Sequence, residues 1–453
     1  MITKIKWKDH LVLGNLELDL TDENGNPYNT IILAGENGTG KTTILETLSI
    51  FLNLGEIKPF DYIEYKIAEN HYHISAKTER DGDLGFHHRK NLNDNSEVYV
   101  HSNRNNSPDL IKTDLADLRH YGFAYTKARS GFKTNSIKNS STAQLDSTKY
   151  NIDSNDDFTN IKQLLVDIDT QDNATWMKIT KNGDPTTFEE FKSISNMYRF
   201  EHAFNNFFDK IKFKEIDNTS PTEKKIIFEK DGKNIPLDSL STGEKQIVFR
   251  GTQLLRNVNT LNGGTILIDE PELSMHPRWQ EKILNYYRGL FTQNNSQTSQ
   301  IFLATHSEYV LRSALQDRNN VLIITLSETN GILSSNKVTA PSILPCITAA
   351  ETNYLAFGII SVDYHIQLYG YLQAKESKQK IKDCDTFIAS HPLYDLTKYD
   401  KPSSYTDTRS GRTIHYQTLP TYIRNAIDHP DSGNAYTDDE LKLSIEFLIE
   451  LCR

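Results

Sequence analysis

The chain has 453 residues, 24% of them charged and 37% hydrophobic, which suits a globular protein of two or three domains. Its formal net charge of -10 gives no support to broad, non-specific nucleic-acid binding, which depends on Lys and Arg. The start of the chain lacks a signal-peptide pattern, and no apolar run approaches the length that spans a bilayer, so we expect a cytoplasmic protein with no membrane partner. Three scattered cysteines predict neither a disulfide framework nor a zinc site: Cys346, Cys384 and Cys452.

The N-terminal part of the chain alternates apolar and polar residues, as strands do. Residues 3–20 predict two antiparallel strands. Residues 29–35 (NTIILAG) predict a short buried strand, and a helix is expected from Lys41. Residues 60–102 are rich in strand-forming residues and indicate an antiparallel side-lobe.

An insertion is predicted over about 130–215. Its first part, residues 130–157, is rich in Ser, Asn, Lys and Asp, which indicates a solvated loop because such a composition buries little apolar surface. Two helices are expected to follow, near 158–170 and 187–211.

Short apolar strands alternate with helices after residue 225. The strands are GTILID, QIFLAT and NVLIIT, and the helices are expected to start near Ser241, Pro277 and Ser307. This alternation predicts a parallel sheet covered on both faces. After Pro345 the pattern changes to helices with many tyrosines, so a domain boundary is expected there.

A phosphate-binding loop is predicted at residues 32–43 (ILAGENGTGKTT), which fit G-x-x-x-x-G-K-[ST] between a strand and a helix. Glycines let backbone N–H groups surround phosphate oxygens, and the helix dipole adds attraction. Lys41 supplies a charge for the β- and γ-phosphates, and the Thr42 hydroxyl can bind Mg²⁺. The sequence therefore predicts ATP and Mg²⁺ as cofactors, with ATP contacts from Gly35, Asn37, Gly38, Thr39, Gly40, Lys41, Thr42 and Thr43.

The stretch TILIDEPELSMHP supplies acidic groups at the end of a second apolar strand. Asp269 is expected to bind Mg²⁺, directly or through water. Glu270 comes next and is predicted to be the general base that activates the attacking water. His306 ends a further strand, where it can contact the γ-phosphate and that water. Glu270 and His306 are therefore the predicted catalytic residues.

Residues 240–246 (LSTGEKQ) begin a predicted helix. Ser241 and the backbone N–H groups around Gly243 predict an anion site at the helix N-terminus. The strand order implied by the sequence places this helix away from the chain's own phosphate loop. Such a site can serve the nucleotide of a neighbouring chain.

The Walker A loop, LSTGE, LIDEPE and ATHS, in this order, resemble the ATP-binding-cassette (ABC) ATPases over residues 1–340. With an early phosphate loop and no membrane span, the chain is similar to Rad50, SMC proteins and the "overcoming lysogenization defect" (OLD) ATPases. The resemblance implies a head-to-tail dimer that sandwiches ATP, with Ser241, Gly243 and Glu244 contacting the ATP of the facing protomer. Arg129 lies where OLD-like chains carry the counterpart of the glutamine loop.

The expected fold class is therefore α/β. Residues 1–345 should form an ABC-type P-loop ATPase domain with a mixed sheet, an antiparallel side-lobe and the helical insertion. Residues 346–453 should form a helical C-terminal domain for oligomerisation or partner binding. No long heptad segment separates Walker A from LSTGE, and this absence counts against a Rad50- or SMC-like repair ATPase. That alternative would require DNA-stimulated hydrolysis.

The C-terminal tail contains two weak nuclease signals. Asp383 and Asp385 form a lone D-x-D without the other residues of a Toprim site, and a solvated acidic turn is the simpler interpretation. Arg424, Asn425 and His429 resemble the R-x(4–6)-H motif of HEPN ribonucleases, in which His moves a proton and Arg faces the phosphate. The alternatives are an ATP-gated ribonuclease or a structural role for these side chains.

The tail as a whole, including AAETNYLAFGIISVDYHIQLYGYLQ, resembles the PtuA family, the ATPases of Septu and related retron anti-phage systems. The resemblance implies a homo-oligomer that does not cut nucleic acid itself but controls a PtuB-like HNH nuclease. In a retron, a reverse transcriptase and its msDNA would join the complex, and nucleic acid would be contacted through that complex. Five aromatic residues of this region can be core or docking surface: Tyr354, Phe357, Tyr364, Tyr369 and Tyr371.

Overall fold

The computed structural model divides into two compact units, Met1–Lys337 and Val338–Arg453, so the division falls a few residues before the expected position at 345. The predicted loop at 130–157 and Arg129 lie outside the described residues, except for a short strand at Tyr150–Ile152. The described residues are 1–128, 150–152, 158–220, 223–255, 261–293, 296–317, 319–338, 343–406, 413–430 and 433–453.

A seven-stranded sheet forms the centre of the first unit. The strands Thr30–Gly35, Thr265–Asp269 and Gln300–Thr305 are short, apolar and fully buried, as expected of a parallel sheet between two layers. Neighbouring strands are parallel except at one edge, where β18 pairs antiparallel with β17. The order is β18 (Ile332–Lys337), β17 (Val321–Thr329), β3 (Thr30–Gly35), β16 (Gln300–Thr305), β13 (Thr265–Asp269), β8 (Phe123–Thr126) and β9 (Tyr150–Ile152).

A second, six-stranded sheet is the predicted antiparallel side-lobe. Its alternating burial pattern reflects one apolar and one polar face. The strand order is β2 (Glu17–Asp19), β1 (Ile2–Trp7), β4 (Phe60–Ile67), β5 (Asn70–Ser75), β6 (His87–Asn91) and β7 (Glu97–Val100). Short helices accompany it: α2 (Glu79–Asp83), α3 (Pro108–Thr113) and the 3-10 turn η1 (Leu118–Tyr121).

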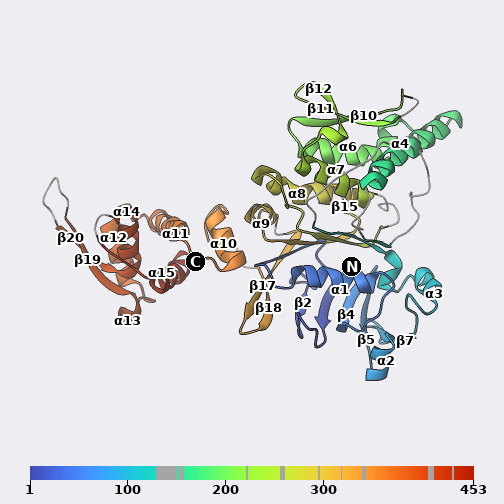
Figure 1. Cartoon of the computed structure of the whole chain (residues 1–453). Helices are drawn as coiled ribbons and strands as arrows, with labels where there is room; N and C mark the ends of the chain where they lie inside the picture. The colour runs from blue at the N-terminus through green and yellow to red at the C-terminus, as the bar shows by residue number, and fades with distance from the viewer. Residues whose placement is uncertain are drawn as a thin grey trace. The chain divides into compact units, whose positions relative to one another are not determined.

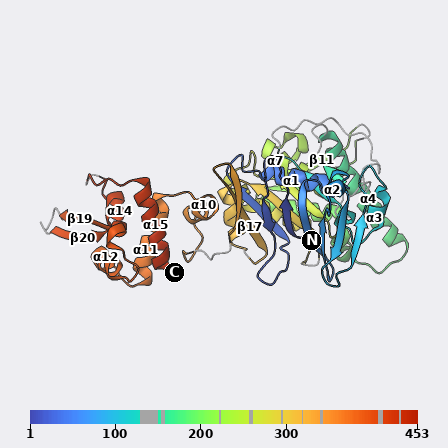
Figure 2. The same ribbon diagram turned by 90° about the horizontal axis from the view of Figure 1, so that it is seen from below.

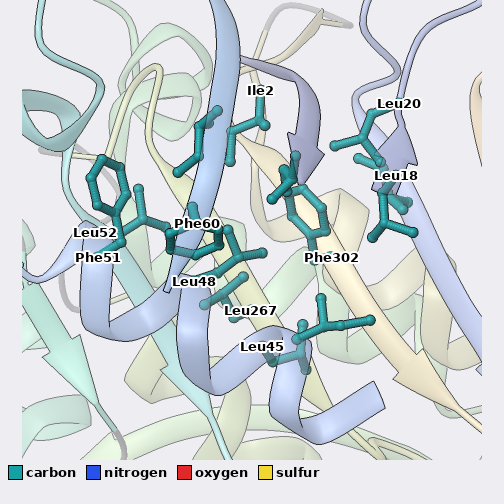
Figure 3. Packing of buried hydrophobic residues seen from close by; sticks show 14 of the residues in the cluster. Ile2, Leu18, Leu20, Leu45, Leu48, Phe51, Leu52, Phe60, Leu267 and Phe302 are labelled. Carbon is teal, nitrogen blue, oxygen red and sulfur yellow. The ribbon is translucent and has the colours of Figure 1, made fainter. Parts of the chain in front are cut away.

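The core of this unit lies between the two sheets, around helix α1 (Lys41–Leu52). In Figure 3, Leu45, Leu48 and Phe51 of α1 meet side chains from both sheets, such as Phe60 and Phe302. Fully burying each such side chain stabilises the fold by about 1.5–3 kcal/mol. The helix that begins at the phosphate loop is thereby fixed on both sides.

Helices α4, α6, α7 and α8 lie on the opposite face of the central sheet from α1 (Figure 1). The predicted helix at 187–211 is two helices, because the Ser195 hydroxyl caps a new helix by accepting from the Tyr198 N–H. The elements here are α4 (Phe158–Lys181), α5 (Phe188–Ile194), α6 (Asn196–Phe207), β10 (Ile211–Asp217), β11 (Lys225–Lys230), β12 (Lys233–Pro236), η2 (Leu237–Ser239), α7 (Thr242–Leu255), α8 (Pro277–Leu290), β14 (Thr292–Gln293), β15 (Ser296–Gln297) and α9 (Glu308–Leu315).

The second unit is mainly helical, with one hairpin that the sequence analysis did not predict. Figures 1 and 2 show α11, α14 and α15 side by side, with the hairpin β19–β20 next to α12 and α14. Alternation in the hairpin is weak because it contains Pro402 and many polar residues. The elements are α10 (Ala349–Phe357), α11 (Val362–Lys375), α12 (Ile381–Ser390), α13 (Leu396–Tyr399), β19 (Asp400–Thr406), β20 (Thr413–Thr418), α14 (Leu419–Asp428) and α15 (Asp438–Cys452).

The tail aromatics contribute mostly to the core of this unit. Tyr364 and Tyr369 are fully buried, while Tyr354 and Tyr371 are partly buried against the same core. Phe357 is also only partly exposed. The three cysteines are free thiols: Cys346 is exposed, and Cys384 and Cys452 are buried.

Candidate nucleotide site

The phosphate loop joins β3 to α1, and two of its glycines cannot be replaced without strain. Gly35 has φ of 152°, and a Cβ there would lie 2.6 Å from the Leu326 carbonyl oxygen on β17. Gly40, the N-cap of α1, is left-handed, and a Cβ there would lie 2.6 Å from Leu13 Cδ2. Among the described residues no side chain caps α1. Its first N–H groups and positive dipole end are thus available to an anion.

Lys41 is buried at the first turn of α1. Its Nζ donates to the carbonyl oxygens of Gly35 and Glu36, both at 2.8 Å. Burial lowers the pKa of Lys41, whereas the charges of Glu270 and Asp269 act in the opposite direction. The ammonium group is therefore held inside the loop, close to the acidic residues that follow β13.

Thr42 and Asp269 meet although they are 227 positions apart in the chain. The Thr42 hydroxyl lies 3.2 and 3.1 Å from the two carboxylate oxygens of Asp269. Burial raises the pKa of Asp269 to about 6, and neighbouring Glu270 adds to this effect. A hydroxyl and a buried carboxylate are the hard oxygen ligands that Mg²⁺ takes together with phosphate oxygens, so the pair fits a Mg²⁺ ion. Within the described part of the chain, no group of three or more His, Cys, Asp and Glu forms a metal site by itself.

Glu270 and His306 lie side by side at the ends of neighbouring strands. One Glu270 carboxylate oxygen is 3.4 Å from His306 Nδ1, and the two side chains are 25% and 44% exposed. The Glu270 N–H donates to the Ala304 carbonyl oxygen at 3.0 Å. This bond holds Glu270 at φ of 42°, where residues other than glycine are strained. The structure thus brings the two predicted catalytic side chains together where water can reach them.

Glu272 is a third acid in this cluster, and the sequence analysis did not include it. It is only 4% exposed, and its Oε1 accepts from the Thr305 hydroxyl at 2.6 Å and from the His306 N–H at 3.1 Å. Burial raises its pKa. The sequence signal that could have pointed to Glu272 is its place in the motif D-E-P-E. The spacing of a motif alone does not show whether an acid is buried or lies on the surface.

The LSTGE stretch caps its own helix. The Ser241 N–H donates to Glu244 Oε2 at 2.8 Å, and the Glu244 N–H points back to Ser241 Oγ at 3.4 Å, which is a capping box. Lys230 of β11 holds the other Glu244 oxygen at 2.8 Å. Gly243 leaves little room, because a Cβ there would lie 3.0 Å from the Ser274 carbonyl oxygen. Within the described residues, none of the hydrogen bonds of Ser241 and Glu244 reaches the phosphate loop.

Arg250 is a second residue that sequence reasoning missed. It lies on α7, and its guanidinium donates to the Asp269 carbonyl oxygen at 3.0 Å and to the Lys127 carbonyl oxygen at 2.8 Å. It therefore joins the LSTGE helix to the ends of β13 and β8. A lone Arg within a helix carries no sequence signal for such a role.

The residues of the tail motif have contacts within their own unit. Arg424 pairs with Asp428 at 2.5 Å and donates to Asn425 Oδ1 at 3.0 Å. His429 follows α14 and stacks on Tyr405, with ring centroids 5.0 Å apart. No hydrogen bond or ion pair joins Arg424 to His429 among the described residues.

The D-x-D pair does not form the expected solvated turn. Asp383 and Asp385 both lie on α12. Asp385 is buried, and its carboxylate accepts from the backbone N–H groups of Gln417 and Thr418 and from the Thr418 hydroxyl. The turn interpretation is wrong because this carboxylate anchors the segment that enters α14.

The central sheet, the phosphate loop and the Thr42–Asp269 pair define a P-loop ATPase domain of the ABC type, as the sequence predicted. The chain belongs to the family described as "AAA domain, putative AbiEii toxin, Type IV TA system", which matches residues 31–312. It is similar to "Retron Vc95 probable ATPase" of Vibrio cholerae serotype O1 biovar El Tor. The two are 24% identical over 362 residues, which cover 65% of this chain and 69% of that protein.

Two solved SMC heads align with part of this chain. The SMC head domain from Thermotoga maritima aligns with a TM-score of 0.38 and 15% identity, over 75% of this chain and 99% of that chain. The second is the Smc head domain with an extended coiled coil, bound to the C-terminal domain of ScpA and derived from Pyrococcus furiosus. It aligns with a TM-score of 0.38 and 13% identity, over 74% of this chain and 96% of that chain. Within the residues described, no helix is both long and apolar enough to cross a membrane.

Proposed function

We propose that this chain is a Mg²⁺-dependent ATPase that acts as scaffold and nucleotide sensor of an anti-phage defence complex. The observation that carries the ATPase activity is the meeting of Thr42 and Asp269 beside the Glu270–His306 pair. Family membership and the similarity to a retron ATPase support the defence context.

Each side chain of the site has a role in hydrolysis. Lys41 and the first turn of α1 bind the phosphates, and Thr42 with Asp269 would hold Mg²⁺. When bound, Mg²⁺ supplies positive charge to the phosphate oxygens. Glu270 accepts a proton from the attacking water, and His306 orients that water and the γ-phosphate.

The facing protomer completes the site through Ser241 and Gly243. The side chain of Ser241 is exposed, and its oxygen already accepts from the Glu244 N–H, so its proton can be donated to a phosphate. The N-terminus of α7 adds the positive dipole end. Glu244, which the resemblance also placed at the facing ATP, is engaged with Ser241 and Lys230 of its own chain, and we propose that it shapes this anion site.

Replacing Glu270 by Gln tests the ATPase assignment. The variant loses the general base but keeps the phosphate site, so ATP should bind with unchanged affinity while kcat falls by about 100-fold or more. Phosphate release and nucleotide binding are measured on the purified protein. Glu46→Gln changes an exposed acid on α1 and should keep the wild-type rate. Wild-type turnover in Glu270→Gln would refute the assignment.

The finer proposal is a PtuA-like regulator that controls a separate HNH nuclease. The chain would form a homo-oligomer built on ATP-sandwich dimers and, in a retron, would also join a reverse transcriptase and its msDNA. Support comes from the tail, where Arg424 is already paired with Asp428 and His429 with Tyr405. We propose that these residues, and Asn425 between them, stabilise the C-terminal unit and do not cleave RNA.

A cleavage assay on the chain alone separates a regulator from a nuclease. Purified protein, freed of partners, is incubated with total RNA, single-stranded DNA and duplex DNA, with and without ATP. We expect no cleavage of any substrate. Cleavage of RNA that His429→Ala abolishes would show that the tail is a ribonuclease. DNA-stimulated ATP hydrolysis would favour a repair ATPase.

A further inference from the structure

The buried carboxylate of Glu272 accepts a hydrogen bond from the backbone N–H of His306, and the proposed function does not use this carboxylate. Both residues follow strands of the central sheet, β13 for Glu272 and β16 for His306. Oε2 of Glu272 is buried and has no hydrogen-bond partner among the described residues. Burying an acid with one oxygen unpaired costs free energy, so a buried Glu at this position calls for a compensating role.

Glu272 fixes the backbone at Thr305 and His306 by hydrogen bonds. Its Oε1 accepts from the Thr305 hydroxyl and from the His306 N–H. The same Thr305 oxygen accepts from the Ser307 N–H at 3.0 Å, and Ser307 caps α9. The turn from β16 into α9 is therefore tied to the loop after β13 through one carboxylate.

The imidazole of His306 presents one nitrogen to carboxylates. Nδ1 lies 3.4 Å from a Glu270 oxygen and 3.6 Å from Glu272 Oε1. Two negative groups at that distance favour a proton on Nδ1. Nε2 has no partner in the part of the chain that the structure describes. It is therefore the nitrogen left for a ligand.

A cavity of about 270 Å³ lies beside this arrangement. His306 and Glu272 line it together with Ser274, Gln280, Glu308 and Tyr309. Glu308 is thus a second carboxylate of the same cavity, two residues from His306, and it offers a matched comparison for Glu272.

We infer that Glu272 is a positioning residue for ATP hydrolysis: it fixes the backbone, ring orientation and Nδ1 proton of His306, so that Nε2 faces the nucleotide. This inference rests on the proposed ATPase function. A purely structural Glu272 would stabilise the fold without acting through His306, and the two possibilities give different kinetics.

Glu272→Gln retains the size of the side chain and an acceptor oxygen for Thr305 and His306, but it removes the negative charge. We expect kcat to fall by about tenfold to 100-fold, with KM for ATP changed less than about threefold. Glu308→Gln should stay within about twofold of wild type. An equal loss in both variants, or no loss in Glu272→Gln, overturns the inference.

The double variant with His306→Ala shows whether Glu272 acts through the imidazole. In that background Glu272→Gln should cause no further loss of kcat, because the group it positions is gone. The same loss in both backgrounds would make Glu272 independent of His306. If Glu272→Gln does not fold, Thr305→Val can replace it, because this change removes the hydrogen bond from Thr305 to the Glu272 carboxylate. Thr305→Val should lower kcat when His306 is present and should cause no further loss in His306→Ala.

A readout without turnover keeps this test separate from the proposed function. The ¹⁵N imidazole resonances of His306, assigned by their loss in His306→Ala, report which nitrogen carries the proton. Wild type should show the Nδ1–H form, and Glu272→Gln should shift toward the other tautomer. An unchanged spectrum overturns the inference. A wild-type chain that never hydrolyses ATP would instead overturn the proposed function, even if the tautomer shift is observed.

Discussion

Asp269 and Glu270 are two neighbouring residues that occupy unfavourable local states. The Asp269 carboxylate is buried, which raises its pKa to about 6, and Glu270 has a left-handed backbone with φ of 42°. The left-handed backbone of Glu270 costs about 1–3 kcal/mol. Both states persist because β13 is paired on one side with β16 and on the other with β8, which leaves the chain no alternative path. The fold thereby supplies the free energy that holds an acidic site ready for a cation.

The raised pKa of Asp269 predicts a pH-dependent stability for the metal-free protein. The folded state binds this proton more tightly than the unfolded chain, whose ordinary pKa is 3.8. The contribution is present at low pH and is lost as the pH rises through about 6, by about 2–3 kcal/mol.

Urea unfolding of wild type and Asp269→Asn between about pH 4 and about pH 8 measures this effect. Asn cannot ionise, so the variant should gain stability relative to wild type as the pH rises. A difference that is the same at every pH would contradict the prediction. Added Mg²⁺ should reduce the difference, because the cation stabilises the charged carboxylate of wild type.

At the scale of elements, the LSTGE stretch forms a helix cap, and we propose that it also serves as an anion site. The same capping box occurs at the start of α5, where Thr187 pairs with Glu190, and at the start of α15. The pattern S/T-x-x-E by itself therefore predicts only a helix start. What distinguishes α7 is its Arg250, which reaches the carbonyl oxygen of Asp269.

Paired cap variants separate the two roles of Ser241. Ser241→Ala and Thr187→Ala each remove a capping side chain and should each lower the free energy of unfolding by about 1 kcal/mol. Only Ser241→Ala should also abolish ATP turnover. Thermal unfolding and phosphate release measure the two effects, and a wild-type rate in Ser241→Ala would show that its hydroxyl serves the helix alone.

Element boundaries followed from the sequence where local signals were strong. The strand before the phosphate loop and the helix after it were predicted correctly because Gly35, Gly40 and an apolar run mark them. The separation of α5 from α6 was missed; Ser195 caps α6 by accepting from the Tyr198 N–H, and its hydroxyl also donates to the distant Asp172. The hairpin β19–β20 was missed because its strands are mostly polar and exposed.

On the scale of the whole molecule, one chain carries all the groups of the nucleotide site, but Ser241 and the phosphate loop are not bonded to each other. A head-to-tail dimer would bring them together across its two-fold axis. The symmetry of such a dimer makes a direct prediction, because each site takes its loop from one chain and its serine from the other.

Mixing two inactive variants tests this arrangement. Lys41→Ala destroys the phosphate loop, and Ser241→Arg blocks the facing anion site. In an equal mixture half of the dimers are mixed, and each mixed dimer has one intact site of two, so about a quarter of wild-type activity should return. Phosphate release is measured before and after mixing. If mixing restores no activity, Lys41 and Ser241 act in a site formed by a single chain.

The sequence by itself determined the phosphate loop, the acidic pair at Asp269 and Glu270, His306 and the α/β class. These depend on short-range patterns, since backbone preferences and strand periodicity are readable over a few residues. Only the tertiary structure decided that Thr42 meets Asp269, that Glu272 is buried behind His306, and that Arg250 spans two strand ends. Burial and charge pairing depend on which distant elements pack together, and that is a property of the folded chain.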